Sequence, residues 1–179
     1  MKAVMQIVAA AMLALSCGCV FSGVNTAPEI FDPVQDSAVC DLPVNRLRVT
    51  NESGADRRFL YRKKNNRMCF DEYKLWILDP ELLIKRAFKS VFVRHNRNAS
   101  DITCTIDRFE FDLVNNCAVL KLTVEISKGA AQRSFSCSEK ASLASGSSPD
   151  ASNAAAKCIK SALEKICAEY ANFSGKGNK

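Results

Sequence analysis

Apolar and polar residues alternate over several stretches of this chain, which is the pattern of strands that bury one face. The alternation predicts strands over residues 46–50, 58–62, 67–73, 101–113, 117–127 and 131–140. Asparagine, glycine, serine and lysine fill the intervals at 51–54 and 63–66, as tight turns require. The pattern therefore predicts an antiparallel sheet.

The hairpin of residues 101–127 is the longest, and the asparagines at 115–116 are its turn signal. A turn centred there pairs Leu113 with Ala118, so that apolar residues meet across the strands. The next strand, joined by a turn at Lys128-Gly129, places Cys137 opposite Leu120. This register predicts that the Cys137 thiol lies in the core.

Two segments have helical spacing instead. The first begins at Asp79, a good N-cap residue, with Pro80 at the first helical position, and is expected to end near His95 as a cation at the helix C-terminus. Its apolar face is expected to comprise Leu83, Ala87, Phe88, Val91 and Phe92. The second helix is predicted over 152–170, with a buried stripe of Ala155, Ile159, Leu163, Ile166 and Tyr170.

Together these elements predict an α+β fold. We expect a two-layer sandwich in which two helices cover an antiparallel sheet of about five to six strands. The 179 residues provide enough chain for one domain with a substantial core.

The first residues have the features of an export signal. Lys2 precedes an apolar run that is short for a membrane span, and small residues precede Cys17 and Cys19. This pattern predicts a bacterial lipoprotein signal, with acylation at Cys17 or alternatively at Cys19. More than one acyl chain, palmitate among them, would anchor the protein stably.

The chain divides accordingly into four parts. Residues 1–16 are the predicted signal peptide, and 17–44 the acylated N-terminus and a proline-containing tether. Residues 45–172 form the folded domain, and 173–179 a polar tail. No other apolar run approaches transmembrane length.

The composition gives little support to an enzyme. His95 is the only histidine, which excludes a two-histidine zinc site, and the chain has no phosphate-binding loop or GxSxG motif. We therefore predict no catalytic residue, no metal and no cofactor. Nine cysteines in an exported chain leave the disulfide state open.

One basic run interrupts an otherwise mixed distribution of charge in a chain of net charge +6. It comprises Arg57, Arg58, Arg62, Lys63, Lys64 and Arg67. We favour a solvated hairpin edge, whose lysines discourage strand addition, over a surface for anionic headgroups or nucleic acid. No nucleic-acid partner is predicted.

The segment from Arg57 to Phe88 resembles the ABC-type transport auxiliary lipoproteins, the PqiC-like family. The shared residues are Leu60-Tyr61-Arg62, Asp71-Glu72-Tyr73, Trp76 and Pro80. Among them we expect Tyr61, Arg62, Tyr73, Trp76 and Pro80 to be structural, with Tyr73 and Trp76 packed in the core or at the edge where the hairpin meets the first helix.

This resemblance implies a non-catalytic component of an ABC/MCE-type intermembrane lipid (phospholipid) transport system. The implied partners are an MCE-domain protein and an ABC permease and ATPase, or a PqiA-like membrane protein. The implied location is the outer membrane, lipid-anchored and facing the periplasm, where the protein would dock the transporter's periplasmic part. A homo-oligomeric ring is compatible with this role. The alternative is a standalone envelope lipoprotein that binds a hydrophobic ligand or supports outer-membrane assembly.

Overall fold

The central element of the fold is the antiparallel hairpin of β6 (Ser100–Asp112) and β7 (Cys117–Lys128), which β8 (Ala131–Ser142) extends. The structure is a computed structural model that describes residues 27–34, 43–92, 94–145 and 147–175. Ala118, Leu120, Leu122, Val124 and Ile126 on β7 are buried on one face, as the alternation predicts. All six strands expected from alternation are present.

The other edge of β6 carries two strands in succession. β2 (Pro43–Asn51) runs parallel to its first half, and β3 (Arg58–Arg62) runs parallel to its end. β4 (Met68–Trp76) pairs with β3 in antiparallel fashion, and two short strands, β1 (Glu29–Phe31) and β5 (Arg94–His95), complete a sheet of eight. Parallel neighbours need a crossover connection. α2 (Pro80–Val91) lies in the connection that leads from β2 and β3 to β6.

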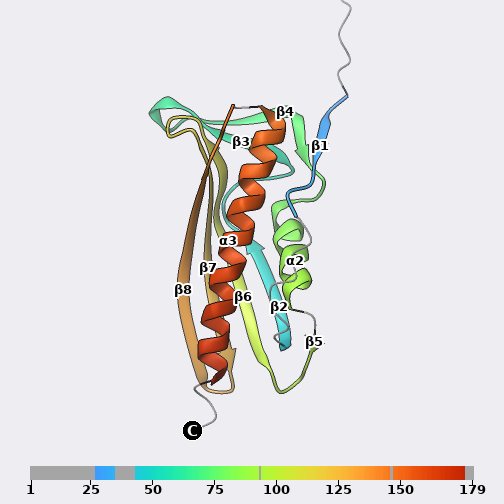
Figure 1. Ribbon diagram of the computed structural model, residues 1–179, viewed down its shortest axis with the longest axis vertical. Coiled ribbons are helices and arrows are strands. Elements are labelled where there is room, and N and C mark those ends of the chain that lie inside the picture. The colour runs from blue at the N-terminus through green and yellow to red at the C-terminus, as the bar shows by residue number, and fades with distance from the viewer. Residues whose placement is uncertain (1–26, 35–42, 93, 146, 176–179) are drawn as a thin grey trace, which may run out of the picture.

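Both helices cover the same face of the sheet (Figure 1). α3 (Ser148–Gly175) packs on β7 and β8, and α2 packs on β2 beside it. The predicted α+β sandwich of one sheet and two helices is therefore confirmed. The sheet has more strands than expected, and it is only mostly antiparallel, because β2 and β3 join β6 in parallel orientation. Within the described ranges, neither helix has the length and hydrophobicity needed to cross a bilayer.

α2 begins as predicted, with Asp79 at the N-cap position and Pro80 at the first turn, but it ends at Val91. The predicted extension to His95 was wrong. Phe92 leaves the helical conformation, and its ring stacks on Phe88 and meets the edge of Tyr170. The chain then turns back, and the backbone of Arg94–His95 pairs with β2 instead.

α3 is longer than predicted at both ends. Ser147 precedes its first residue and caps it: the Ser147 hydroxyl oxygen accepts a hydrogen bond from the Asp150 backbone N–H at 3.4 Å, and the hydroxyl donates to the Asp150 carboxylate at 2.9 Å. All five residues of its predicted stripe are buried. The helix continues to Gly175, so part of the expected polar tail is helical, and Phe173 packs against the core.

The predicted registers were each wrong by two residues. Phe111, not Leu113, lies opposite Ala118, and Cys137 lies opposite Leu122. Cys137 is nevertheless buried, as predicted, because a shift of two residues keeps each side chain on its face. The segment expected to be only a tether contributes β1, which pairs with the end of β4.

Candidate interaction surface at the hairpin end

The hairpin of β3 and β4 extends across one end of the molecule (Figure 1). Its turn is the 3-10 segment η1 (Lys64–Asn66), closed by a hydrogen bond from the Lys63 backbone N–H to the Arg67 carbonyl oxygen at 2.8 Å. Asn65 and Asn66 have φ values of 60° and 57°, in the left-handed region that asparagine tolerates. The predicted polar turn is thus confirmed.

The basic run does not form one continuous surface, because its first three arginines have internal partners. Arg58 binds Asp56 and Glu72, and its guanidinium lies 4.3 Å from the centre of the Phe70 ring. Arg57 donates a hydrogen bond through Nε to the Trp76 carbonyl oxygen at 3.0 Å. These contacts fasten the open end of the hairpin.

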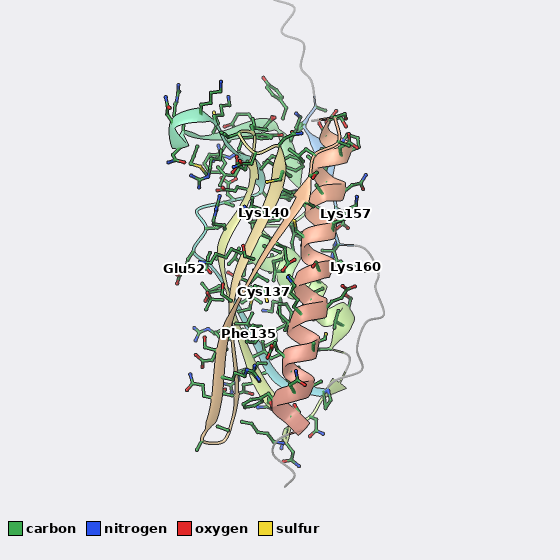
Figure 2. The ribbon with its side chains drawn as sticks, turned by 60° about the vertical axis from the view of Figure 1, so that its left-hand side comes forward. Glu52, Phe135, Cys137, Lys140, Lys157 and Lys160 are labelled. Carbon is green, nitrogen blue, oxygen red and sulfur yellow. The ribbon has the colours of Figure 1, made fainter. Side chains whose placement is uncertain are left out.

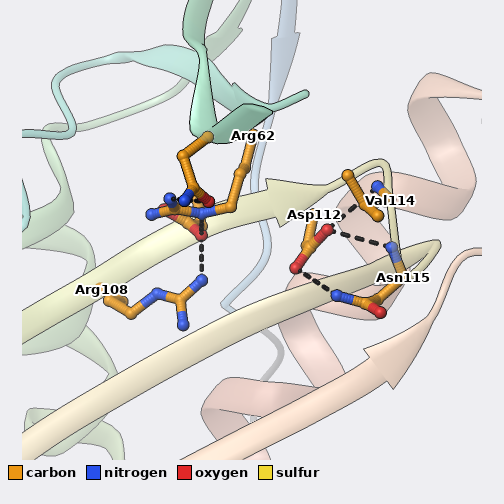
Figure 3. Close-up of polar contacts among 7 residues, drawn as sticks. Arg62, Arg108, Asp112, Val114 and Asn115 are labelled. Carbon is orange, nitrogen blue, oxygen red and sulfur yellow. Dashed lines mark hydrogen bonds and ion pairs between the residues drawn. The ribbon is translucent and has the colours of Figure 1, made fainter. Parts of the chain in front are cut away.

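Arg62 forms an ion pair with a buried carboxylate. Its Nε and Nη2 donate to the two carboxylate oxygens of Glu110, at 2.6 and 3.0 Å, and Arg108 contacts the same carboxylate (Figure 3). The Glu110 side chain is 3% exposed. Burial would raise the pKa of Glu110, but the hydrogen bonds from both arginines outweigh this effect and hold the pKa below its ordinary value.

The remaining cations of the run are Lys63, Lys64 and Arg67, which lie exposed around the turn. Within the part of the chain that the structure describes, their side chains make no ion pair. The nearby acids already have partners, since Glu72 binds Arg58 and Asp71 binds Lys74 at 3.4 Å. The tip of the hairpin is therefore a site of uncompensated positive charge.

Apolar side chains adjoin these cations. Leu113 and Val114, in the β6–β7 loop, are 44% and 56% exposed. They are exposed because Asp112 closes the loop early: its carboxylate accepts hydrogen bonds from the backbone N–H groups of Val114 and Asn115, both at 3.0 Å (Figure 3). The Leu113 N–H donates to the Arg62 carbonyl oxygen at 2.9 Å, which fixes this loop beside the hairpin.

β4 presents further exposed apolar residues, namely Met68, Phe70 and Tyr73. Phe70 and Tyr73 line an open groove of about 510 Å³, together with Tyr61, Lys63 and Leu113. We call the exposed cations Lys63, Lys64 and Arg67 together with the exposed apolar residues Met68, Phe70, Tyr73, Leu113 and Val114 the hairpin-end patch. Sequence reasoning identified its cations but missed most of its apolar part, which alternation assigned to ordinary strand faces.

The residues that carry the family resemblance have different roles in this arrangement. Trp76 is 2% exposed and packs between Phe59 and Phe109, at ring-centroid distances of 4.2 and 5.1 Å, as expected. Tyr61 is half-buried, with its ring 5.5 Å from that of Phe111. These residues join the base of the hairpin to the core.

Tyr73 differs from the expected packed position, because it is 58% exposed. It lies where the pairing of β3 with β4 is interrupted, between the pair Phe59–Asp71 and the pair Arg58–Leu75. The Asp71 carboxylate accepts a hydrogen bond from the Tyr73 backbone N–H at 3.0 Å, which stabilises this bulge. Pro80 is buried at the start of α2, in the structural position that we expected for it.

The gap lined by Leu60, Trp76 and Ala155 leaves no room for a water molecule. Among the described residues, no group of three or more histidine, cysteine or acidic side chains is placed to hold a metal ion. Burial raises the pKa of the Cys104 and Cys158 thiols to about 12. The predicted acylation sites, Cys17 and Cys19, lie outside the described residues.

The fold has relatives among solved structures. No family model matches the sequence, and a search of curated proteins gives no significant match. An uncharacterized protein of known crystal structure is 8% identical, with a TM-score of 0.67 over 80% of this chain and 98% of its own. A Xanthomonas campestris protein designated DUF330 is 14% identical, with a TM-score of 0.57 over 85% of this chain and 95% of its own. Both likenesses show a shared fold.

Proposed function

We propose that this protein is a non-catalytic lipoprotein component of an ABC/MCE-type intermembrane lipid transport system, docking the transporter's periplasmic part at the outer membrane. The observation that carries the proposal is that the segment from Arg57 to Phe88 has both inward-facing and exposed residues. Arg62, which pairs with the buried Glu110 carboxylate, and the buried Trp76 hold the hairpin to the core, while Tyr73, Lys63, Lys64 and Arg67 lie on the surface. The motif segment thus presents an exposed contact surface at one end of the molecule, as a component that docks a transporter at a membrane requires.

The partners that follow from the resemblance are an MCE-domain protein and its membrane partner, either an ABC permease with its ATPase or a PqiA-like protein. The experiment is to co-express the full chain, tagged at its C-terminus, with an MCE-domain protein from the same genome. Retention of that protein through affinity purification in detergent is the expected result. Absence of association, both in purification and in crosslinked membranes, would contradict the proposal.

A matched control separates anchoring from docking. The double variant Cys17→Ser/Cys19→Ser removes both predicted acylation sites and leaves all described residues unchanged. We expect this variant to bind the MCE protein in detergent and to disappear from the outer-membrane fraction. An unchanged distribution between fractions would contradict the lipid anchor alone.

The groove beside Tyr61 favours a second candidate, a standalone lipoprotein that holds a hydrophobic ligand. Its volume of about 510 Å³ lies in the usual range of ligand sites, and apolar and charged side chains line it. Native mass spectrometry of the purified protein decides between the two. One lipid bound per chain supports the ligand-binding protein, whereas an empty chain that retains the MCE partner supports the docking component.

A further inference from the structure

The hairpin-end patch combines two properties that suit a membrane surface. Its cations Lys63, Lys64 and Arg67 have no carboxylate partner among the described residues, and Met68 follows them directly. Lysine and arginine bury their aliphatic stems beside apolar groups while keeping their charges in the headgroup layer. Aromatic and aliphatic side chains beside such cations are typical of interfacial segments.

The patch also lies at the end of the molecule where the chain enters the fold. β1 pairs with β4, so residue 29 lies opposite Lys74 on the second strand of the hairpin, and β1 and the hairpin lie together at the top of Figure 1. Ile30 adds another exposed apolar side chain there. Position 27 comes ten residues after position 17, and an extended chain of that length spans at most about 35 Å.

We infer that the hairpin-end patch binds anionic phospholipid headgroups on the membrane that holds the acylated N-terminus, and so orients the domain end-on to that bilayer. The inference rests on the proposed function for the lipid anchor. The short reach from Cys17 favours a bilayer over a protein as the occupant, because the anchor would bring this end to the lipid surface. The contact needs both parts of the patch: the cations attract the surface, and the apolar side chains enter it.

The expected size of the effect follows from the charges. Each lysine or arginine close to an anionic membrane surface strengthens binding about fivefold. Replacing Lys63, Lys64 and Arg67 by glutamine therefore weakens the contact on the order of 100-fold. The effect also falls with added salt, since the three side chains are exposed.

The test is hydrogen exchange of the acylated, full mature protein in vesicles. One vesicle preparation contains phosphatidylethanolamine and phosphatidylglycerol, and the other contains phosphatidylcholine alone. We expect slower amide exchange in β4 and the β6–β7 loop on the anionic vesicles only. The β7–β8 turn, around Gly129, serves as an internal control that does not change.

Two variants make the result specific. The triple variant Lys63→Gln/Lys64→Gln/Arg67→Gln should lose the protection. A matched variant, Lys140→Gln/Lys157→Gln/Lys160→Gln, loses the same charge from exposed positions on β8 and α3 (Figure 2). This variant should keep the protection from exchange. Equal protection in all three proteins, or none on either vesicle, overturns the inference.

Two further outcomes separate this inference from the proposed function. Protection that arises only after the MCE protein is added assigns the patch to a protein partner and overturns the membrane contact. Intact mass measurement reports acylation independently. If the chain carries no acyl group, the anchor fails, and flotation of the same protein with anionic vesicles then decides the headgroup contact directly.

Discussion

The ion pair of Arg62 with Glu110 offers the sharpest test of how the hairpin is held. Glu110 lies on β6 with its side chain 3% exposed, and Arg62 is its bidentate partner from β3. Replacing Arg62 by alanine leaves a buried carboxylate with Arg108 as its remaining charged partner. Because the hairpin joins β6 through only two residue pairs, this change removes a main attachment.

The magnitude follows from the burial of the carboxylate. Removing one partner of a buried ion pair costs about 3–5 kcal/mol when the other charge is left uncompensated. Arg108 remains and compensates part of the charge, so we expect Arg62→Ala to lower the free energy of unfolding by about 2–3 kcal/mol. The matched control is Arg67→Ala, which removes an exposed arginine from the same hairpin and should change stability by less than about 0.5 kcal/mol.

The assay is urea unfolding followed by circular dichroism, with Glu110→Gln and the double variant completing a thermodynamic cycle. We expect a coupling energy of about 1–3 kcal/mol between the two positions. Glu110 also gives the cycle a pH dependence. Its pKa in the folded protein lies below the ordinary 4.5, so its contribution to stability is present above about pH 4.5 and is lost as the pH falls through the folded value.

In Arg62→Ala this acid-dependent loss should be smaller, because the pKa of Glu110 moves back toward its ordinary value. A stability change below about 0.5 kcal/mol for Arg62→Ala, together with a coupling energy near zero, would refute the reasoning. Such a result would mean that the hairpin is held by its aromatic contacts alone.

Three further predictions concern the aromatic cluster, the loop and the thiols. Because Trp76 is buried and Tyr73 is exposed, Trp76→Ala should lower the free energy of unfolding by about 3–5 kcal/mol and Tyr73→Ala by less than about 0.5 kcal/mol. Equal losses for the two variants in denaturant unfolding would contradict this prediction. Asn116 has a φ of 49°, so in thermal unfolding Asn116→Val should cost about 1–2 kcal/mol more than Asn116→Gly, a ranking that equal melting temperatures would overturn. Iodoacetamide at pH 8 should leave Cys104 and Cys158 unmodified in the native protein and label both after denaturation, as peptide mass spectrometry can check.

Local patterns were sufficient to predict the main strands and the cores of both helices. In β7 every second residue is apolar, and in α3 the apolar residues recur every three or four positions, so each element carries its own signal. The order of the strands could not be predicted in this way. β2 and β3 both lie along one edge of β6 in parallel orientation, and that arrangement depends on contacts between segments distant in the sequence.

The two short strands have a different explanation. β1 and β5 contribute three and two residues, too few for a period to show. They join the sheet through backbone hydrogen bonds, which any sequence can make. Their positions follow from the neighbouring strands, and only the folded structure reveals them.

The predicted register of β6 and β7 was wrong for a chemical reason that the sequence contains. Asp112 accepts hydrogen bonds from backbone groups two and three residues ahead, which starts the loop before Leu113. An aspartate before an asparagine pair was therefore the stronger turn signal. The same residue explains why Leu113 and Val114 are exposed rather than paired, so the error in register and the missed apolar patch have one cause.

The arrangement of the hairpin accounts for the spacing of the motif residues. Two residue pairs between β3 and β6 are a weak attachment for a hairpin that projects across the end of the molecule. Arg62 fastens it on one face of the sheet through Glu110, and Trp76 fastens it on the other face through the aromatic cluster. A single fastening would leave the hairpin free to twist about its attachment. Two fastenings on opposite faces fix its orientation, and with it the direction in which the patch cations and Tyr73 point.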